Sequence, residues 1–133
     1  MIEFKNVSKV YDNGSVALDD VCLTINDGEF VLVCGHSGAG KSTLFKLLTH
    51  EVVPDAGTVI VDDFDVTRMK RSKIPKLRRK LGVVFQDFRL LPNKTVAENI
   101  AFALEVIEEK PKIIKEKVSH VLDLVGLSEK AHD

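Results

Sequence analysis

A glycine-rich loop between an apolar run and a helix-like stretch is the feature that most limits what this chain can fold into. The loop residues are Gly35, His36, Ser37, Gly38, Ala39, Gly40, Lys41, Ser42 and Thr43. The spacing Gly-x-x-x-x-Gly-Lys-Ser is typical of a phosphate-binding loop, because the glycines let successive backbone N–H groups turn toward one anion. Such a loop requires a buried strand before it and a helix after it, so the motif predicts an α/β fold.

Each position of the loop has a chemical reason to be there. Lys41 places a positive charge beside the β and γ oxygens of a nucleotide, and Ser42 offers a hydroxyl to Mg²⁺. Thr43 adds a hydroxyl or an N–H group for the α-phosphate, and a helix beginning at Lys41 directs its positive end toward the phosphates. The loop is therefore predicted to bind ATP with Mg²⁺. The alternative is a glycine-rich turn that binds nothing, and for His36 only the backbone is assigned to the site.

Hydrophobic periodicity predicts the elements on either side of the loop. Alternation or short apolar runs predict strands at 2–10, 17–25, 30–34, 58–61 and 83–85. The two N-terminal strands are expected to form an antiparallel edge, with Val21, Leu23 and Ile25 on the buried face. The runs 30–34 and 83–85 lack alternation, so they are expected to be strands covered on both faces, the former central and parallel.

Helical spacing predicts four helices. One begins at Lys41, and a basic one covers about 72–80 and ends at Gly82. A third follows the capping box formed by Thr95 and Glu98, and a fourth begins near Pro111 and ends at Gly126. The expected apolar stripes are Val96, Ile100, Leu104 and Ile107 on the third helix, and Ile114, Val118, Val121, Leu122 and Val125 on the fourth. We therefore expect a nucleotide-binding core over 1–86 and the start of a helical subdomain over 87–133.

Composition excludes several classes of protein. The 44% apolar and 29% charged residues are ordinary for one soluble globular domain, and no apolar run is long enough to span a membrane. Cys22 and Cys34 have no metal-binding or redox spacing and are expected to be reduced and buried.

The net charge of −1 hides a basic cluster with no acidic residue between Arg68 and Gln86. Its members are Arg68, Lys70, Arg71, Lys73, Lys76, Arg78, Arg79 and Lys80. The cluster is interpreted as a solvated helix face, and binding of nucleic acid or anionic lipid is the alternative.

Two further residues distinguish between classes of phosphate-loop protein. A GTPase would be expected to recognise guanine through an Asn-Lys-x-Asp motif. This motif is absent, because Asn93 and Lys94 are followed by Thr95 and Val96. With Tyr11 after the first strand, the loop at 35–43 and Gln86 after a short strand, the chain resembles the ATP-binding subunit of ABC transporters over its whole length. This resemblance implies that Tyr11 stacks on adenine. It also implies that Gln86 contacts Mg²⁺ and the attacking water, so that Lys41 and Gln86 are the candidate catalytic residues and Ser42 and Gln86 the metal ligands.

Within this family, the stretch 82–99 together with 74–80 resembles the cell-division type, FtsE. The resemblance implies a membrane partner resembling FtsX and a peripheral location on the cytoplasmic face of the inner (plasma) membrane. Phe88, Leu90 and Leu91 are the candidate partner contacts, with internal packing as the alternative. Another ABC system, such as lipoprotein release or amino-acid import, is the alternative function. A nucleic-acid-binding module using 68–80 is an alternative of another class, which the resemblance disfavours.

The family pattern extends beyond the residues present here. Its signature motif, Walker B aspartate, catalytic glutamate and switch histidine follow the region that matches the last residues of this chain. We therefore expect an N-terminal fragment with an incomplete core and exposed apolar strand edges. The resemblance implies a head-to-tail homodimer for the full-length protein, and the fragment is expected to bind nucleotide weakly without turning it over.

Overall fold

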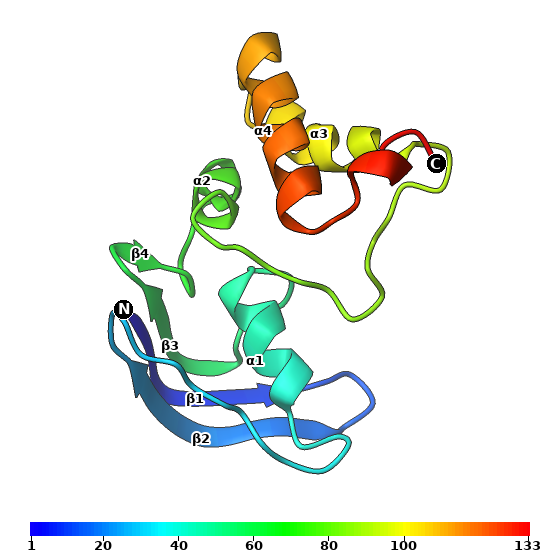
Figure 1. Ribbon diagram of the computed structural model, residues 1–133. Helices are drawn as coiled ribbons and strands as arrows, with labels where there is room; N and C mark the ends of the chain where they lie inside the picture. Colours follow the sequence, from blue (N-terminus) through cyan, green and yellow to red (C-terminus); the bar gives the residue numbers. More distant parts are fainter. The chain divides into compact units, whose positions relative to one another are not determined.

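The computed structural model describes residues 1–133. In chain order the elements are β1 (Ile2–Val10), β2 (Val16–Ile25), α1 (Lys41–Leu48), β3 (Ala56–Val61), β4 (Phe64–Asp65), the 3-10 turn η1 (Arg71–Lys73), α2 (Ile74–Arg78), α3 (Val96–Val106), α4 (Pro111–Leu124) and the 3-10 turn η2 (Ser128–Lys130) (Figure 1). The chain divides into two compact units, Met1–Gly82 and Val83–Asp133. The predicted boundary after Gln86 stays a prediction. No helix is both long and apolar enough to cross a bilayer.

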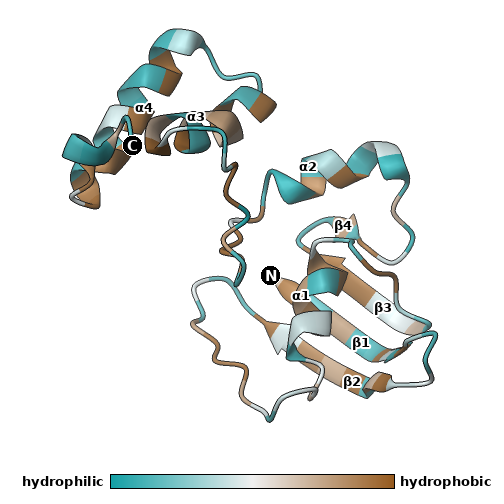
Figure 2. Cartoon of the chain, turned by 90° about the vertical axis from the view of Figure 1, so that its right-hand side faces the viewer, coloured by the Kyte–Doolittle hydropathy of each residue, from teal (hydrophilic) through white to brown (hydrophobic).

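The first unit is built on a four-stranded sheet with the order β2-β1-β3-β4. All neighbouring strands are antiparallel, and Phe4 of β1 lies opposite Leu23 of β2 on one side and Val59 of β3 on the other. Hydrophobic residues recur along these strands (Figure 2). The predicted strands at 2–10, 17–25 and 58–61 and the antiparallel edge are confirmed.

The core of this unit joins the sheet to two helices. Its buried residues are Phe4, Val7, Leu18, Leu47, Val59, Val61, Val66 and Leu77. Leu47 comes from α1 and Leu77 from α2, so both helices pack on the sheet. The basic segment 68–80 is anchored to the core by the buried Leu77, and Met69 also packs against the core.

The predicted strands at 30–34 and 83–85 are wrong. Neither segment pairs with another strand, and the side chains of Phe30, Leu32 and Val84 are 94%, 76% and 97% exposed. A strand needs the N–H and C=O groups of a neighbouring strand, and β1 to β4 pair only with one another. The exposed apolar segment 30–34 agrees with the expected incomplete core.

The cysteines are also placed differently from the prediction, because both are exposed. Cys22 alternates with the half-buried Val21 and Leu23 on β2 and therefore points to the other face. Cys34 belongs to the segment that has no strand partner. The predicted basic helix over 72–80 is shorter than expected, since α2 begins at Ile74 with Pro75 in its first turn.

The second unit consists of α3, α4 and their connections. The Thr95 side chain accepts from the Glu98 N–H at 3.2 Å, and the Thr95 N–H donates to the Glu98 carboxylate at 2.8 Å, which confirms the capping box. At the end of α4, Gly126 has a φ of 70°. Its N–H bonds to Asp123 and that of Leu127 bonds to Leu122, so Gly126 terminates the helix as predicted.

The apolar stripes of the two helices are only partly buried. Val118 and Leu122 of α4 are 8% and 4% exposed, whereas α3 has no fully buried residue. Ile107, Val121 and Val125 of the predicted stripes lie at the surface. A pair of helices covers only the side chains that face the partner helix, so the rest of each stripe stays exposed.

Leu47→Ala is expected to destabilise the first unit by about 2 to 5 kcal/mol, because it leaves a cavity in the core. Leu32→Ala is the matched control and is expected to change stability by less than about 0.5 kcal/mol, because Leu32 is exposed. Urea unfolding measures both. An equal loss for the two variants would place 30–34 in the core and contradict the structure.

The capping box predicts a pH effect on α3. The Thr95 N–H, and to a lesser extent Lys94, holds the pKa of Glu98 below its ordinary value of 4.5. The ionised carboxylate therefore stabilises α3 above that value, and the contribution disappears as the pH falls through the lowered folded-state pKa. Glu98→Gln keeps an acceptor oxygen but does not titrate. Helicity measured by circular dichroism is expected to favour wild type at neutral pH, with the two curves converging in acid, and parallel curves would refute this role.

Candidate phosphate-binding site

The loop begins α1 at a glycine that no other residue can replace without strain. Gly40 is the N-cap of α1 with a φ of 81°. A Cβ atom built on Gly40 would lie 2.1 Å from the carbonyl oxygen of Ala17. The start of α1 is therefore packed directly against the beginning of β2. This contact places the loop at a defined point of the sheet.

The backbone amides at the start of α1 are free to meet an anion. Within the loop the Ala39 N–H donates to His36 O, and the first helical bond runs from Leu44 N–H to Gly40 O, each at 3.1 Å. The N–H groups of Lys41, Ser42 and Thr43 precede this bond and have no protein acceptor. No acidic side chain lies in the first turn. The helix start therefore presents an uncompensated positive end.

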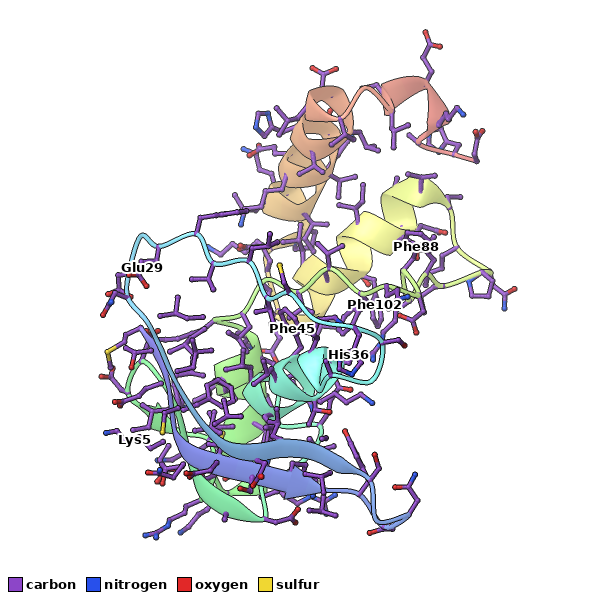
Figure 3. The ribbon with its side chains drawn as sticks, turned by 90° about the horizontal axis from the view of Figure 1, so that it is seen from below. Lys5, Glu29, His36, Phe45, Phe88 and Phe102 are labelled. Carbon is purple, nitrogen blue, oxygen red and sulfur yellow. The ribbon has the colours of Figure 1, made fainter.

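The Lys41 side chain lies within the curve of the loop. Its ammonium donates to Gly35 O at 2.5 Å and to His36 O at 2.6 Å. An ammonium has three N–H donors, so one remains for an anion. Figure 3 shows His36 in the loop that leads into α1.

Ser42 fits the oxygen chemistry of Mg²⁺. The side chain is exposed at the helix start, and its hydroxyl makes no protein hydrogen bond. No group of three or more His, Cys, Asp or Glu side chains is placed so that it could hold a metal ion by itself. Because Mg²⁺ takes hydroxyl, phosphate and water oxygens as ligands, one serine beside bound phosphates suits it.

Tyr11 is joined to the same helix by its side chain. The Tyr11 hydroxyl lies 3.1 Å from the Thr43 hydroxyl, and either oxygen can donate. Thr43 is 5% exposed. The sequence assigned Thr43 to the phosphate loop from its chemistry and Tyr11 to the site by resemblance. It contained no signal for their direct contact, because the two residues are far apart along the chain.

Sequence reasoning missed two residues beside Tyr11. Asp55 accepts the Val10 N–H at 2.7 Å and the Lys9 ammonium at 3.2 Å. The Val10 N–H first, and then Lys9, lowers the pKa of Asp55 from its ordinary value. The Lys9 ammonium also lies 6.0 Å from the centroid of the Tyr11 ring. The sequence marked Asp55 only as a turn residue and gave no indication of its contacts with Lys9 and Val10.

The remaining candidate residues belong to the second unit, and their roles stay predictions. Gln86 is exposed, as are Phe88 at 76% and Leu90 at 68%. Leu91 is half-buried. Its N–H donates to the Asn99 side chain at 2.7 Å, and its carbonyl accepts from the same side chain at 3.2 Å.

The basic cluster is partly engaged within its own unit. Arg78 donates to Thr49 O at 3.0 Å, and the Lys80 ammonium lies 3.9 Å from the Asp62 carboxylate and 5.7 Å from the Phe64 ring centroid. The other members are exposed. This distribution is typical of a solvated helix face.

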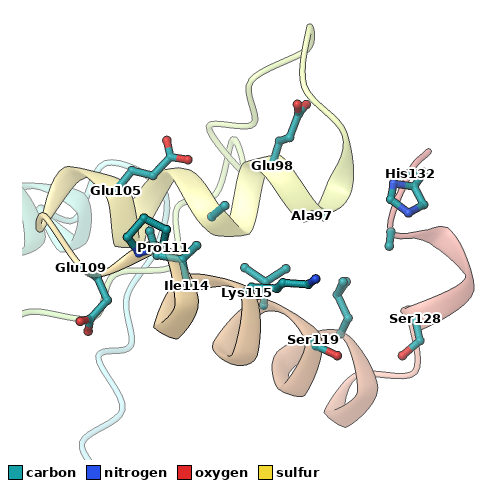
Figure 4. A pocket seen from close by; sticks show the side chains of 14 residues that line it. Ala97, Glu98, Glu105, Glu109, Pro111, Ile114, Lys115, Ser119, Ser128 and His132 are labelled. Carbon is teal, nitrogen blue, oxygen red and sulfur yellow. The ribbon is translucent and has the colours of Figure 1, made fainter.

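The second unit contains a hollow of about 710 Å³ between α3 and α4 (Figure 4). Its lining includes Ile114 and Val118 of α4, Glu98 and Glu105 of α3, and His132 near the chain end. None of the predicted site residues lines it. The candidate chemistry therefore stays with the loop at 35–43.

A family model described as ABC transporter matches residues 18–133. The chain belongs to the ABC transporter family. Over 131 residues it is 54% identical to the cell division ATP-binding protein FtsE of Bacillus subtilis, which covers 98% of this chain and 58% of that protein. It is 42% identical over 132 residues to the methionine import ATP-binding protein MetN of Helicobacter acinonychis, covering 99% of this chain and 40% of that protein. The chain thus spans about half the length of these ABC relatives.

A solved ABC cassette has the same fold. It is an ATP-binding cassette in a dimeric post-hydrolysis state, bound to ADP and Pi. The TM-score is 0.88 at 32% identity, over 99% of this chain and 60% of that one. The expected phosphate-loop α/β fold of ABC ATPase type, with part of the sheet present, is therefore confirmed.

The packing of Gly40 gives a test with a built-in control. Gly40 and Gly38 have φ angles of 81° and 82°, so alanine at either position pays about 1 to 2 kcal/mol for the left-handed backbone. Only at Gly40 does the new Cβ meet the Ala17 carbonyl, since nothing lies within 4 Å of the position at Gly38. Gly40→Ala is expected to lower the urea midpoint clearly more than Gly38→Ala. Equal losses would show that α1 does not start against Ala17.

Proposed function

We propose that this chain is the ATP-binding part of an ABC-type ATPase that couples ATP binding and hydrolysis to a membrane partner in bacterial cell division. The observation that carries the proposal is the convergence of three free amides and the Lys41 ammonium at the start of α1. Backbone amides at a helix start, together with a lysine, form a binding site for a polyphosphate. The 54% identity to FtsE of Bacillus subtilis supports cell division as the process.

The residues of the site have different proposed roles in binding phosphate, Mg²⁺ and adenine. The loop amides and Lys41 hold the β and γ oxygens, and Lys41 offsets negative charge on the transferring phosphoryl group. Ser42 would hold Mg²⁺, which supplies further neutralisation of the phosphate oxygens. The Tyr11 ring offers a stacking surface for adenine. Hydrolysis is proposed for the whole protein, acting as a head-to-tail homodimer.

The proposed membrane partner is a subunit resembling FtsX, at the cytoplasmic face of the plasma membrane. Phe88 and Leu90 support a docking role because they expose large apolar side chains in one short loop. Phe88 and Arg89 both have positive φ values, 57° and 48°, an uncommon conformation for non-glycine residues. Leu91 offers less apolar surface, because it is half-buried.

Methionine import is the second candidate, since MetN of Helicobacter acinonychis is 42% identical to this chain. A genetic test distinguishes a role in cell division from a role in methionine import. The chain's segment is exchanged for the matching segment of FtsE in Bacillus subtilis or of MetN in Helicobacter acinonychis. Restored division in the first strain supports the proposal, and restored methionine uptake in the second alone would replace it.

Nucleic acid is not a partner in this proposal. Arg78 and Lys80 already contact Thr49 and Asp62 of their own unit. A salt-dependent titration with RNA or DNA is expected to show only weak, sequence-independent binding that disappears as salt rises. Tight binding that persists at physiological salt would favour the nucleic-acid module instead.

Lys41→Ala is expected to weaken Mg²⁺-ATP binding about 10- to 100-fold, because a charged hydrogen bond to phosphate contributes about 1.5 to 3 kcal/mol. Lys46→Ala removes an exposed lysine from the same helix and serves as the matched control, with affinity unchanged. Isothermal titration with and without Mg²⁺ measures both variants. Equal affinities of wild type and Lys41→Ala would refute phosphate binding by the loop.

A further inference from the structure

Hydrogen bonds fix the backbone at Tyr11 and at the residue before it. Its N–H donates to Ser15 O at 2.9 Å and its carbonyl accepts from Gly14 N–H at 2.8 Å, which closes the turn after β1. On the preceding side, Asp55 accepts the Val10 N–H. The backbone of Tyr11 therefore has little freedom. The direction of the ring depends on what the side chain contacts.

Two groups contact that side chain. The Tyr11 hydroxyl lies 3.1 Å from the Thr43 hydroxyl on α1. The Lys9 ammonium lies over the ring at 6.0 Å from its centroid; this lysine side chain is 16% exposed and pairs with Asp55 at 3.2 Å. A cation over one face of an aromatic ring is attracted to it and occupies that face. The opposite face of the Tyr11 ring is left for stacking by a nucleotide base.

Thr43 is suited to hold the ring. It is 5% exposed, and β-branched side chains in helices have restricted χ1 angles. Its hydroxyl makes no hydrogen bond other than the one to Tyr11, while its N–H at the helix start has no protein acceptor. The two polar groups of Thr43 thus point to two different tasks. The N–H is available to a phosphate, and the hydroxyl is engaged with Tyr11.

We propose that Thr43 is a positioning residue, whose hydroxyl fixes the Tyr11 ring as the platform for the nucleotide base. This proposal rests on ATP binding at the loop, as argued above. Through one contact, the helix that carries the phosphate amides also sets the place of the base platform. Loss of the Thr43 hydroxyl therefore weakens recognition of the base and leaves recognition of the polyphosphate intact.

The ring can be observed directly, because Tyr11 is the only tyrosine and the chain has no tryptophan. In Thr43→Val the ring is released, so acrylamide quenching of Tyr11 fluorescence is expected to increase. Thr43→Ser retains the hydroxyl and is expected to match wild type. Thr49→Val removes another buried hydroxyl from the end of the same helix and is expected to leave Tyr11 quenching unchanged. Circular dichroism confirms that each variant is folded.

Affinity measurements with ATP and with inorganic triphosphate distinguish recognition of the base from recognition of the phosphates. Thr43→Val is expected to lose about 3- to 10-fold in affinity for ATP, the effect of one hydrogen bond, while its affinity for inorganic triphosphate stays within about twofold of wild type. Tyr11→Phe is expected to show a similar loss. The double variant is expected to lose no more than either single variant, because both remove the same contact.

Two results would overturn the positioning role alone. The first is an equal loss of ATP and triphosphate affinity in Thr43→Val, which would assign the hydroxyl to the phosphates. The second is Tyr11 quenching in Thr43→Val that matches wild type. A wild-type chain that binds neither ligand, with Lys41→Ala no different, overturns the proposed function and the base platform together.

Discussion

The close packing of Gly40 against the carbonyl of Ala17 is the constraint on which the candidate site depends. A side chain at this position has no room, so α1 begins directly at the edge of β2. From that start, the amides of Lys41, Ser42 and Thr43 have no acceptor in the protein. The same start places Thr43 beside Tyr11 at the end of β1. One backbone contact therefore organises both the phosphate amides and the aromatic ring.

Charge around the loop follows from the same arrangement. The first turn of α1 carries no acidic residue, and the Lys41 ammonium is held by the carbonyls of Gly35 and His36. Asp55 instead pairs with Lys9, whose ammonium lies over the Tyr11 ring. The Lys41 ammonium thus lies at the loop, while the Asp55 carboxylate accepts from the Val10 N–H of β1 and from Lys9. This separation keeps the helix start attractive to an anion.

Sequence patterns correctly predicted the features of the structure that depend on interactions between residues close together in the chain. The alternation in 17–25, the capping box of Thr95 and Glu98, and the glycine at 126 all matched the structure, since each depends on neighbours within a few residues. The segments 30–34 and 83–85 were predicted as strands and are not, because an apolar run becomes a strand only beside another strand. The burial expected for Cys34 failed for the same reason. Cys22 failed because its face of β2 is not covered.

The sequence by itself determined the chemistry of the loop, because the glycine spacing and the adjacent Lys41 and Ser42 act within a single turn of backbone. It also placed the chain in a family through Tyr11, the loop and Gln86, which the comparisons bear out at the level of the fold and the ABC domain. Only the tertiary structure decided that Thr43 and Tyr11 touch, that Lys9, paired with Asp55, lies over the ring, and that Ala17 packs against the helix start. These contacts join residues from different elements, and no pattern along the chain encodes which elements meet.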